Sequence, residues 1–251
     1  MNRFLAIAVL SVLVLIASAS LTAAQSNSIQ VKTSPNGVSY LTDDSGMTLY
    51  YFTLDTNGQS ACYGGCAEAW PIFYAASVMV SDPLTASDFG TITRTDGSKQ
   101  TTYKGWPLYY WAQDKVPGDM TGEGVHKVWY VLTVPSYTVM IATNEAVGNY
   151  LVDGSGNTLY WFTKDKANMS ACSGDCIKLW PAFTADSFVV PSAMNASDFG
   201  TISRSDGTTQ ATYKGYPLYY WVKDKMRGDV TGQNVGKVWY VIDPEKFPPK
   251  M

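Results

Sequence analysis

Residues 49–55 read Leu-Tyr-Tyr-Phe-Thr-Leu-Asp, and this stretch decides the fold because close copies of it recur three times. The copies are residues 108–114, 159–165 and 218–224, and each has a Tyr two positions before an aromatic residue and five before an Asp. A turn signal with Gly precedes every copy. Aromatic and β-branched residues between turn signals are typical of β-strands. The sequence therefore predicts four related strand segments.

The four segments belong to a longer duplication. Residues 41–131 align with residues 151–241 at a constant offset of 110 without a gap, and 53 of the 91 pairs are identical. A fixed internal period indicates tandem structural units. We place the first unit at 29–133 and the second at 139–243, a normal size for a domain with its own core. Because the connector 134–138 is short, we expect the two units to touch.

Each unit also carries a hairpin signal and a helix signal. Residues 91–97 lead through an Asp-Gly turn into 100–103, and residues 127–132 form a further strand pattern. Only residues 67–70 and their counterpart 177–180 look helical, and Pro71 or Pro181 stops them. We predict an all-β protein of two tandem homologous domains. Each is a β-sandwich or a small barrel with one short helix after a Cys-x-x-x-Cys turn.

The N-terminus has the pattern of an export signal. Residues 1–24 contain Arg3 and then an apolar run over 4–17 that closes on small residues, and cleavage fits after Ala24 or Ala19. An uncleaved signal-anchor is the alternative, although a membrane span needs about 20 apolar residues. No later run reaches that length. We expect a secreted or cell-envelope protein with no membrane span in the mature chain.

The charge of the chain argues against nucleic acid as a partner. The formal net charge is −3, and no cluster of Lys and Arg is present to follow a phosphate backbone. We therefore expect an envelope or extracellular partner, whose identity the sequence leaves open.

Four cysteines form one Cys-x-x-x-Cys pair per unit, Cys62 with Cys66 and Cys172 with Cys176. Pairing is the default in an oxidising compartment, and of three possible connectivities this one keeps each unit independent. Thiolates at this spacing could instead bind copper or zinc, so a metal-binding or redox envelope protein is the alternative. No further Cys or His lies nearby, which favours disulfides and no cofactor.

Few residues fit a catalytic role. His126 is the only histidine, and its aligned partner is Gly236. Neither a Gly-x-Ser-x-Gly nor a His-Glu-x-x-His motif is present. We interpret His126 as a solvated loop residue. We predict a binding or structural module without catalytic activity.

The strand motifs end on four aspartates, which we interpret as acceptors of backbone N–H groups in turns rather than as paired catalytic or calcium-binding carboxylates. They are Asp55, Asp114, Asp165 and Asp224. By the same reasoning Arg94 and Arg204 are expected to pair with Asp96 and Asp206.

Aromatic residues are the most suggestive candidates for binding. Strand alternation sends Tyr109 and Trp111 to one face, and Tyr219 and Trp221 match them in the second unit. A core role is favoured, because both faces of the strand carry large apolar groups. If one face is open, these aromatics form a platform that could stack sugars or another partner.

Three motifs together carry a family resemblance. They are Tyr-x-aromatic-x-x-Asp, Ser60-x-Cys62-x-x-x-Cys66-x-x-x-Trp70-Pro71, and Thr102-Tyr103-Lys104-Gly105-x-Pro107-Leu108-Tyr109. The chain resembles the secreted repeats of unknown function found in predicted bacterial and archaeal lipoproteins, in two tandem copies over nearly all of the mature chain. The resemblance implies an exported repeat with no established activity. No Cys follows the apolar run directly, so a covalent lipid anchor is not expected.

Overall fold

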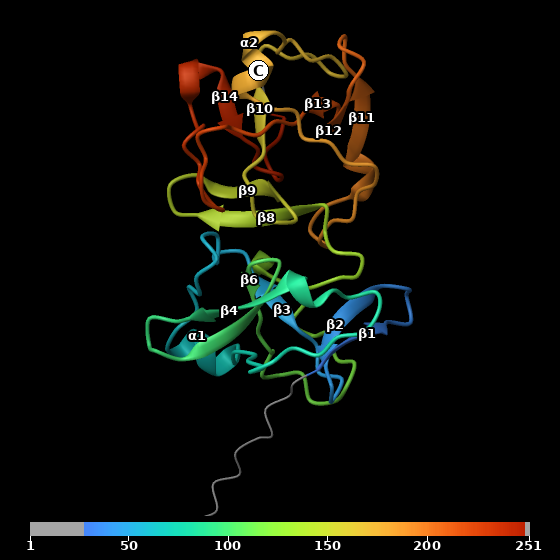
Figure 1. Ribbon diagram of the computed structural model, residues 1–251, viewed down its shortest axis with the longest axis vertical. Helices are drawn as coiled ribbons and strands as arrows, with labels where there is room; N and C mark the ends of the chain where they lie inside the picture. The colour runs from blue at the N-terminus through green and yellow to red at the C-terminus, as the bar shows by residue number, and fades with distance from the viewer. Residues whose placement is uncertain (1–27, 249–251) are drawn as a thin grey trace, which may run out of the picture.

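The computed structural model describes residues 28–248, and the expected signal at 1–24 lies outside these described residues. Figure 1 shows two lobes stacked along the long axis of the molecule. The N-terminal lobe holds β1 to β7, and the C-terminal lobe holds β8 to β14.

The two lobes repeat one order of elements. The N-terminal lobe contains β1 (Ile29–Thr33), β2 (Ser39–Asp43), β3 (Tyr50–Phe52), α1 (Gly65–Ala69), β4 (Phe89–Thr93), β5 (Lys99–Tyr103), β6 (Trp106–Pro107) and β7 (Trp129–Val131), with 3₁₀ turns at Ala86–Asp88 and Val125–Lys127. The C-terminal lobe contains β8 (Val139–Asn144), β9 (Gly148–Asp153), β10 (Tyr160–Phe162), α2 (Asp175–Leu179), β11 (Phe199–Ser203), β12 (Thr209–Tyr213), β13 (Tyr216–Pro217) and β14 (Trp239–Val241), with 3₁₀ turns at Ala196–Asp198 and Val235–Lys237.

The sheets within the described residues are small and antiparallel. The N-terminal lobe pairs β1 with β2, β3 with β7, and β4 with β5 and β6, and the C-terminal lobe repeats all of these pairings. The expected mostly-β fold with one short helix per repeat is confirmed. Of the two architectures considered, the small barrel is wrong, because these two- and three-stranded sheets do not close.

The strand motifs form shorter strands than their sequences predict. Only Tyr50–Phe52 of the first motif is a strand, and residues 108–114 form no strand, although Tyr109 makes isolated backbone bridges with Tyr50 and Ile72. The chain turns early because the Asp55 N–H bonds to the Phe52 carbonyl, 3.1 Å away. The helix also starts two residues before the expected 67–70, inside the cysteine loop.

A column of four stacked rings fills the centre of each lobe. In the N-terminal lobe Trp70 and Trp129 are parallel with centroids 3.9 Å apart, and Phe52 and Trp111 extend the stack at 4.1 and 4.2 Å. Tyr109 meets Trp129 edge-on at 5.1 Å. The C-terminal column consists of Phe162, Trp239, Trp180 and Trp221. Both geometries are favourable for aromatic pairs, so the columns stabilise the lobes beyond simple burial.

The lobes touch through an aromatic face of the N-terminal lobe, as the short connector predicts. We call Tyr51, Trp106 and Tyr130 the docking face; all three are at most 1% exposed and belong to one core cluster with Met140 and Ala142 of β8. Figure 1 shows β8 and β9 at the base of the C-terminal lobe, next to β3 and β6. The hairpin β8–β9 therefore covers the docking face.

Polar contacts fix the register of this interface. The Thr143 N–H donates to the Thr53 carbonyl at 2.9 Å, and the two threonine hydroxyls are 2.8 Å apart. The Arg227 guanidinium lies 4.5 Å from the Trp106 ring centre and donates to the Lys104 carbonyl at 3.3 Å. These contacts hold one lobe in a defined position on the other.

Candidate functional site

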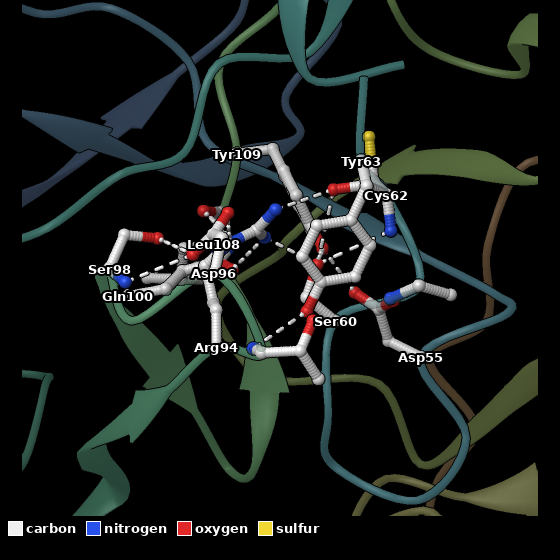
Figure 2. Close-up of polar contacts among 12 residues, drawn as sticks. Asp55, Ser60, Cys62, Tyr63, Arg94, Asp96, Ser98, Gln100, Leu108 and Tyr109 are labelled. Atoms are coloured by element: carbon white, nitrogen blue, oxygen red, sulfur yellow. Dashed lines mark hydrogen bonds and ion pairs between the residues drawn. The ribbon is translucent and has the colours of Figure 1, made fainter. Parts of the chain in front are cut away.

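The polar residues of the repeat motifs form a buried network, shown for the N-terminal lobe in Figure 2. The Asp55 carboxylate accepts the Ala61 N–H and the Tyr109 hydroxyl, each at 2.7 Å. The Tyr109 hydroxyl also lies 2.7 Å from the Ser60 hydroxyl, which the Arg94 guanidinium contacts. Asp55 and Tyr109 are both 0% exposed. This network therefore offers no group to a molecule in solvent.

The tyrosine of each half-repeat bonds to the aspartate of the other half. Tyr50 donates to Asp114 at 2.7 Å, while Tyr109 donates to Asp55. The second lobe repeats this exchange with Tyr160 to Asp224 at 2.7 Å and Tyr219 to Asp165 at 2.8 Å. The exchange ties the two halves together.

All four aspartates also accept a backbone N–H, which confirms the predicted turn role. The donors are Ala61, Thr121, Ala171 and Thr231, at 2.7 to 3.0 Å. The tyrosine partners were not predicted. The repeated Tyr-x-aromatic-x-x-Asp spacing was the available signal, but it does not say which tyrosine meets which aspartate.

Burial changes the protonation of this network. Desolvation raises the pKa of Asp55 to about 7 and that of Asp165 to about 6, although the N–H and hydroxyl donors favour the charged form. The same burial, together with the neighbouring carboxylates, raises the pKa of Tyr109 and Tyr219 above the ordinary tyrosine range. In the N-terminal lobe both members of the pair are completely buried, whereas Asp165 of the C-terminal lobe is 6% exposed and lines a recess.

The arginines connect the network to the cysteine loops. Arg94 lies 3.5 Å from Asp96, and Arg204 lies 3.4 Å from Asp206, so both predicted pairs are confirmed. The closer contact of each arginine is a 2.6 Å bond to a cysteine carbonyl, from Arg94 to Cys62 and from Arg204 to Cys172. Both guanidinium groups therefore hold the cysteine loop, and they also bond to the side chains of Gln100 and Gln210.

The four cysteines form the two predicted disulfides, Cys62–Cys66 and Cys172–Cys176. The Cα atoms of each pair are 5.3 Å apart, within the normal disulfide range. The sulfurs are therefore not thiolates that could ligate a metal. Within residues 28–248 no group of three or more His, Cys, Asp or Glu side chains is placed to hold a metal ion.

The other residues singled out from the sequence occupy different environments. Tyr109 and Tyr219 are completely buried, Trp221 is 8% exposed, and Trp111 is half-buried at the end of its column. His126 is exposed, with a positive φ of 50°. Its aligned partner Gly236 has a φ of 60°, a conformation that glycine adopts without strain.

An open aromatic recess lies on the C-terminal lobe. This C-terminal recess has a volume of about 520 Å³. Its lining includes Trp161, Tyr216, Tyr240 and Phe247, together with Thr163, Asp165, Gln233 and Asp243. Trp161, Tyr216 and Tyr240 are each partly exposed. The recess combines partly exposed rings with hydrogen-bonding groups, a composition typical of binding sites.

The recess is the repeat equivalent of the docking face. At the offset of 110 the pairs are Tyr51 with Trp161, Trp106 with Tyr216, Tyr130 with Tyr240, Thr53 with Thr163, and Tyr137 with Phe247. In the N-terminal lobe β8–β9 covers the face, and Thr53 is 0% exposed. In the C-terminal lobe Thr163 is exposed. The same surface is therefore filled in one lobe and open in the other.

Comparison with known families agrees with this repeat structure. A model of the family described as a secreted repeat of unknown function matches residues 31–73, 90–133, 142–184 and 200–243. The chain belongs to this family, and the four matches correspond to the four half-repeats. No curated protein and no solved structure matches the chain.

The family description is consistent with secretion or an envelope location. Within residues 28–248 the structure contains no helix of the length and apolar character needed to span a membrane.

Proposed function

We propose that the protein is an exported binding or structural module without catalytic activity, made of two domains at 29–133 and 139–243. The C-terminal recess is its binding face for a partner in the envelope or the extracellular space. One observation carries the proposal: protein fills this face in the first lobe, and the equivalent aromatics stay partly exposed in the second. The fully buried Tyr109–Asp55 pair of the N-terminal lobe supports the absence of catalysis, since the fold itself uses its polar groups.

Retention on envelopes tests the binding face. Fluorescently labelled mature protein is sedimented with envelope fragments of the producing cells, and the bound fraction is measured. We expect Tyr240→Ala and Thr163→Arg to lower the bound fraction at least fivefold. Met79→Ala removes a 60% exposed side chain of the other lobe and serves as the matched control. Equal retention of all variants contradicts the proposed site.

A thiol assay separates this function from the metal or redox alternative. We expect no free thiol before or after unfolding in denaturant, since the structure pairs Cys62 with Cys66 and Cys172 with Cys176. We also expect elemental analysis to find no stoichiometric metal. Titratable thiols together with bound copper or zinc would replace the proposal with the alternative.

A further inference from the structure

One side of the lobe interface is the hairpin that covers the docking face, and this hairpin has an equivalent on the surface of the molecule. The hairpin β1–β2 is the repeat equivalent of β8–β9, and within residues 28–248 it lies away from the C-terminal lobe (Figure 1). In β8 the Thr143 hydroxyl bonds to Asn149 at 2.8 Å, and in β1 the Thr33 hydroxyl bonds to Ser39 at 2.9 Å. Thr33 is exposed. The hairpin therefore presents its threonine in the way that β8 does.

The other side of the interface is the docking face, and it also has an exposed equivalent. Thr143 bonds to Thr53 through both backbone and hydroxyl groups, and the repeat equivalents of these residues are Thr33 and Thr163. Both equivalents are exposed. Thr163 lines the recess together with aromatic rings, and Thr53 follows Tyr51 of the docking face by two residues. Both sides of the lobe interface therefore have an exposed equivalent, the hairpin with Thr33 and the recess with Thr163, and these two are not paired with each other.

The positive charge that Arg227 brings to the interface also has an equivalent, Lys32, although the two residues do not occupy aligned positions in the sequence. Arg227 lies against Gly156 and reaches across to Trp106. At the equivalent place in the N-terminal lobe, the Lys32 ammonium lies against Gly46. The two positions are exchanged, since Ala142 aligns with Lys32 and Pro117 aligns with Arg227. Lys32 can therefore supply a positive charge beside Tyr216 as Arg227 does beside Trp106.

We propose that the β1–β2 hairpin of a second copy of this chain docks in the C-terminal recess, repeating between molecules the contact that joins the two lobes. This inference rests on the proposed role of the recess as a binding face. The contact joins different surfaces, so each dimer keeps one free hairpin and one free recess. The protein then assembles head to tail into open chains.

The polar side chains on the hairpin set the strength of this contact. Gln30 and Lys32 replace the buried Met140 and Ala142, so less apolar surface is removed from water than between the lobes. A polar outer face is typical of the terminal unit in a repeat array. The assembly is therefore reversible and depends on protein concentration.

Sedimentation velocity of the mature protein over a wide concentration range tests the assembly. Wild type is expected to shift from monomer to dimer and longer species as concentration rises. Thr33→Arg blocks the hairpin, and Thr163→Arg blocks the recess; each variant alone is expected to stay monomeric. Both positions are exposed, so the fold tolerates the change. Thr93→Arg, at an exposed position of β4, is the matched control and should assemble like wild type.

Mixing the two blocked variants gives the decisive result. Thr33→Arg keeps an intact recess, and Thr163→Arg keeps an intact hairpin, so an equimolar mixture should form 1:1 dimers that grow no further. A wild type that stays monomeric throughout, or a mixture without dimers, overturns the inference. If wild type is monomeric while Thr163→Arg still lowers envelope retention, the recess binds a different partner and the proposed function stands.

Discussion

The Asp55 carboxyl group shows how single residues of this repeat balance burial against bonding. It is completely buried, and its two oxygens accept one N–H and one hydroxyl. Desolvation nevertheless dominates and raises its pKa to about 7. Asp165, the equivalent residue, has a pKa of about 6. The folded protein therefore retains protons that an unfolded Asp, with a pKa of about 4, loses.

This retention predicts that the protein is more stable at pH 5 than at pH 7.5. Between about pH 4 and pH 7 the folded state binds more protons than the unfolded state, so the free energy of unfolding falls as pH rises. We expect a loss of about 4 kcal/mol between pH 5 and pH 7.5, measured by urea unfolding at a series of pH values. Increasing stability up to pH 7.5 would contradict the buried, protonated carboxyls.

The variant Asp55→Asn isolates the cause. Asparagine keeps an oxygen for the Ala61 N–H and does not titrate, so the pH dependence should become clearly flatter. Asp96→Asn removes a carboxyl whose pKa is lowered by bonds from Ser98, and should leave the slope between pH 5 and 7.5 unchanged.

Among the elements, the aromatic column and the cysteine loop lie next to each other. The size of their contributions to the free energy of unfolding decides which one stabilises the lobe more. The loop between Cys62 and Cys66 is so short that its closure stabilises by only about 2 kcal/mol. Truncating a buried tryptophan costs about 3–5 kcal/mol. Trp70 is 3% exposed and stacks on both Trp129 and Trp111. The column is therefore the stronger element.

We predict that Trp70→Ala lowers the free energy of unfolding by about 4 kcal/mol, and that Cys62→Ser with Cys66→Ser lowers it by about 2 kcal/mol. Denaturant unfolding followed by near-UV circular dichroism measures both. Trp180→Ala in the other lobe is the matched variant, because its stacking distances are nearly the same. A larger loss from the disulfide variant than from Trp70→Ala would reverse the ranking.

At the scale of the whole molecule, the lobe interface contains buried polar atoms without protein partners. In the described residues these atoms are the Tyr51 hydroxyl, the Trp106 indole nitrogen, and two nitrogens of Arg227. Desolvation lowers the pKa of Arg227 to about 10, although Asp55 and Asp153 favour its charged form. We therefore expect the apolar stem and ring contact of Arg227 to contribute more to the free energy of unfolding than its charge.

We predict that Arg227→Met changes the free energy of unfolding by less than about 1 kcal/mol, or raises it, because Met keeps a long apolar side chain beside Trp106. Arg227→Ala loses that packing and should cost about 2 kcal/mol. Lys127→Ala breaks the exposed interlobe pair with Glu245 and should cost under about 1 kcal/mol. Urea unfolding compares the three, and a larger cost for Met than for Ala would refute the packing argument.

The sequence predicted those features that depend on neighbouring residues. The hairpin β4–β5, the short helix, both disulfides and the turn role of Asp55 all follow from local patterns. The bond from Tyr109 to Asp55 joins residues 54 positions apart, and the strand motif does not encode such a pairing. The recess was missed for a similar reason, since Trp161 and Tyr51 are alike as residue types and differ only in what covers them.

The aromatic columns have an optical consequence. The indole planes of Trp70 and Trp129 are 3° from parallel at 3.9 Å, and those of Trp180 and Trp239 are 4° from parallel at the same distance. Chromophores this close share their excited states, so light absorbed by one ring is delocalised over the pair. We therefore expect each lobe to give a far-ultraviolet circular dichroism signal from exciton coupling. That signal should disappear when the column of the same lobe opens.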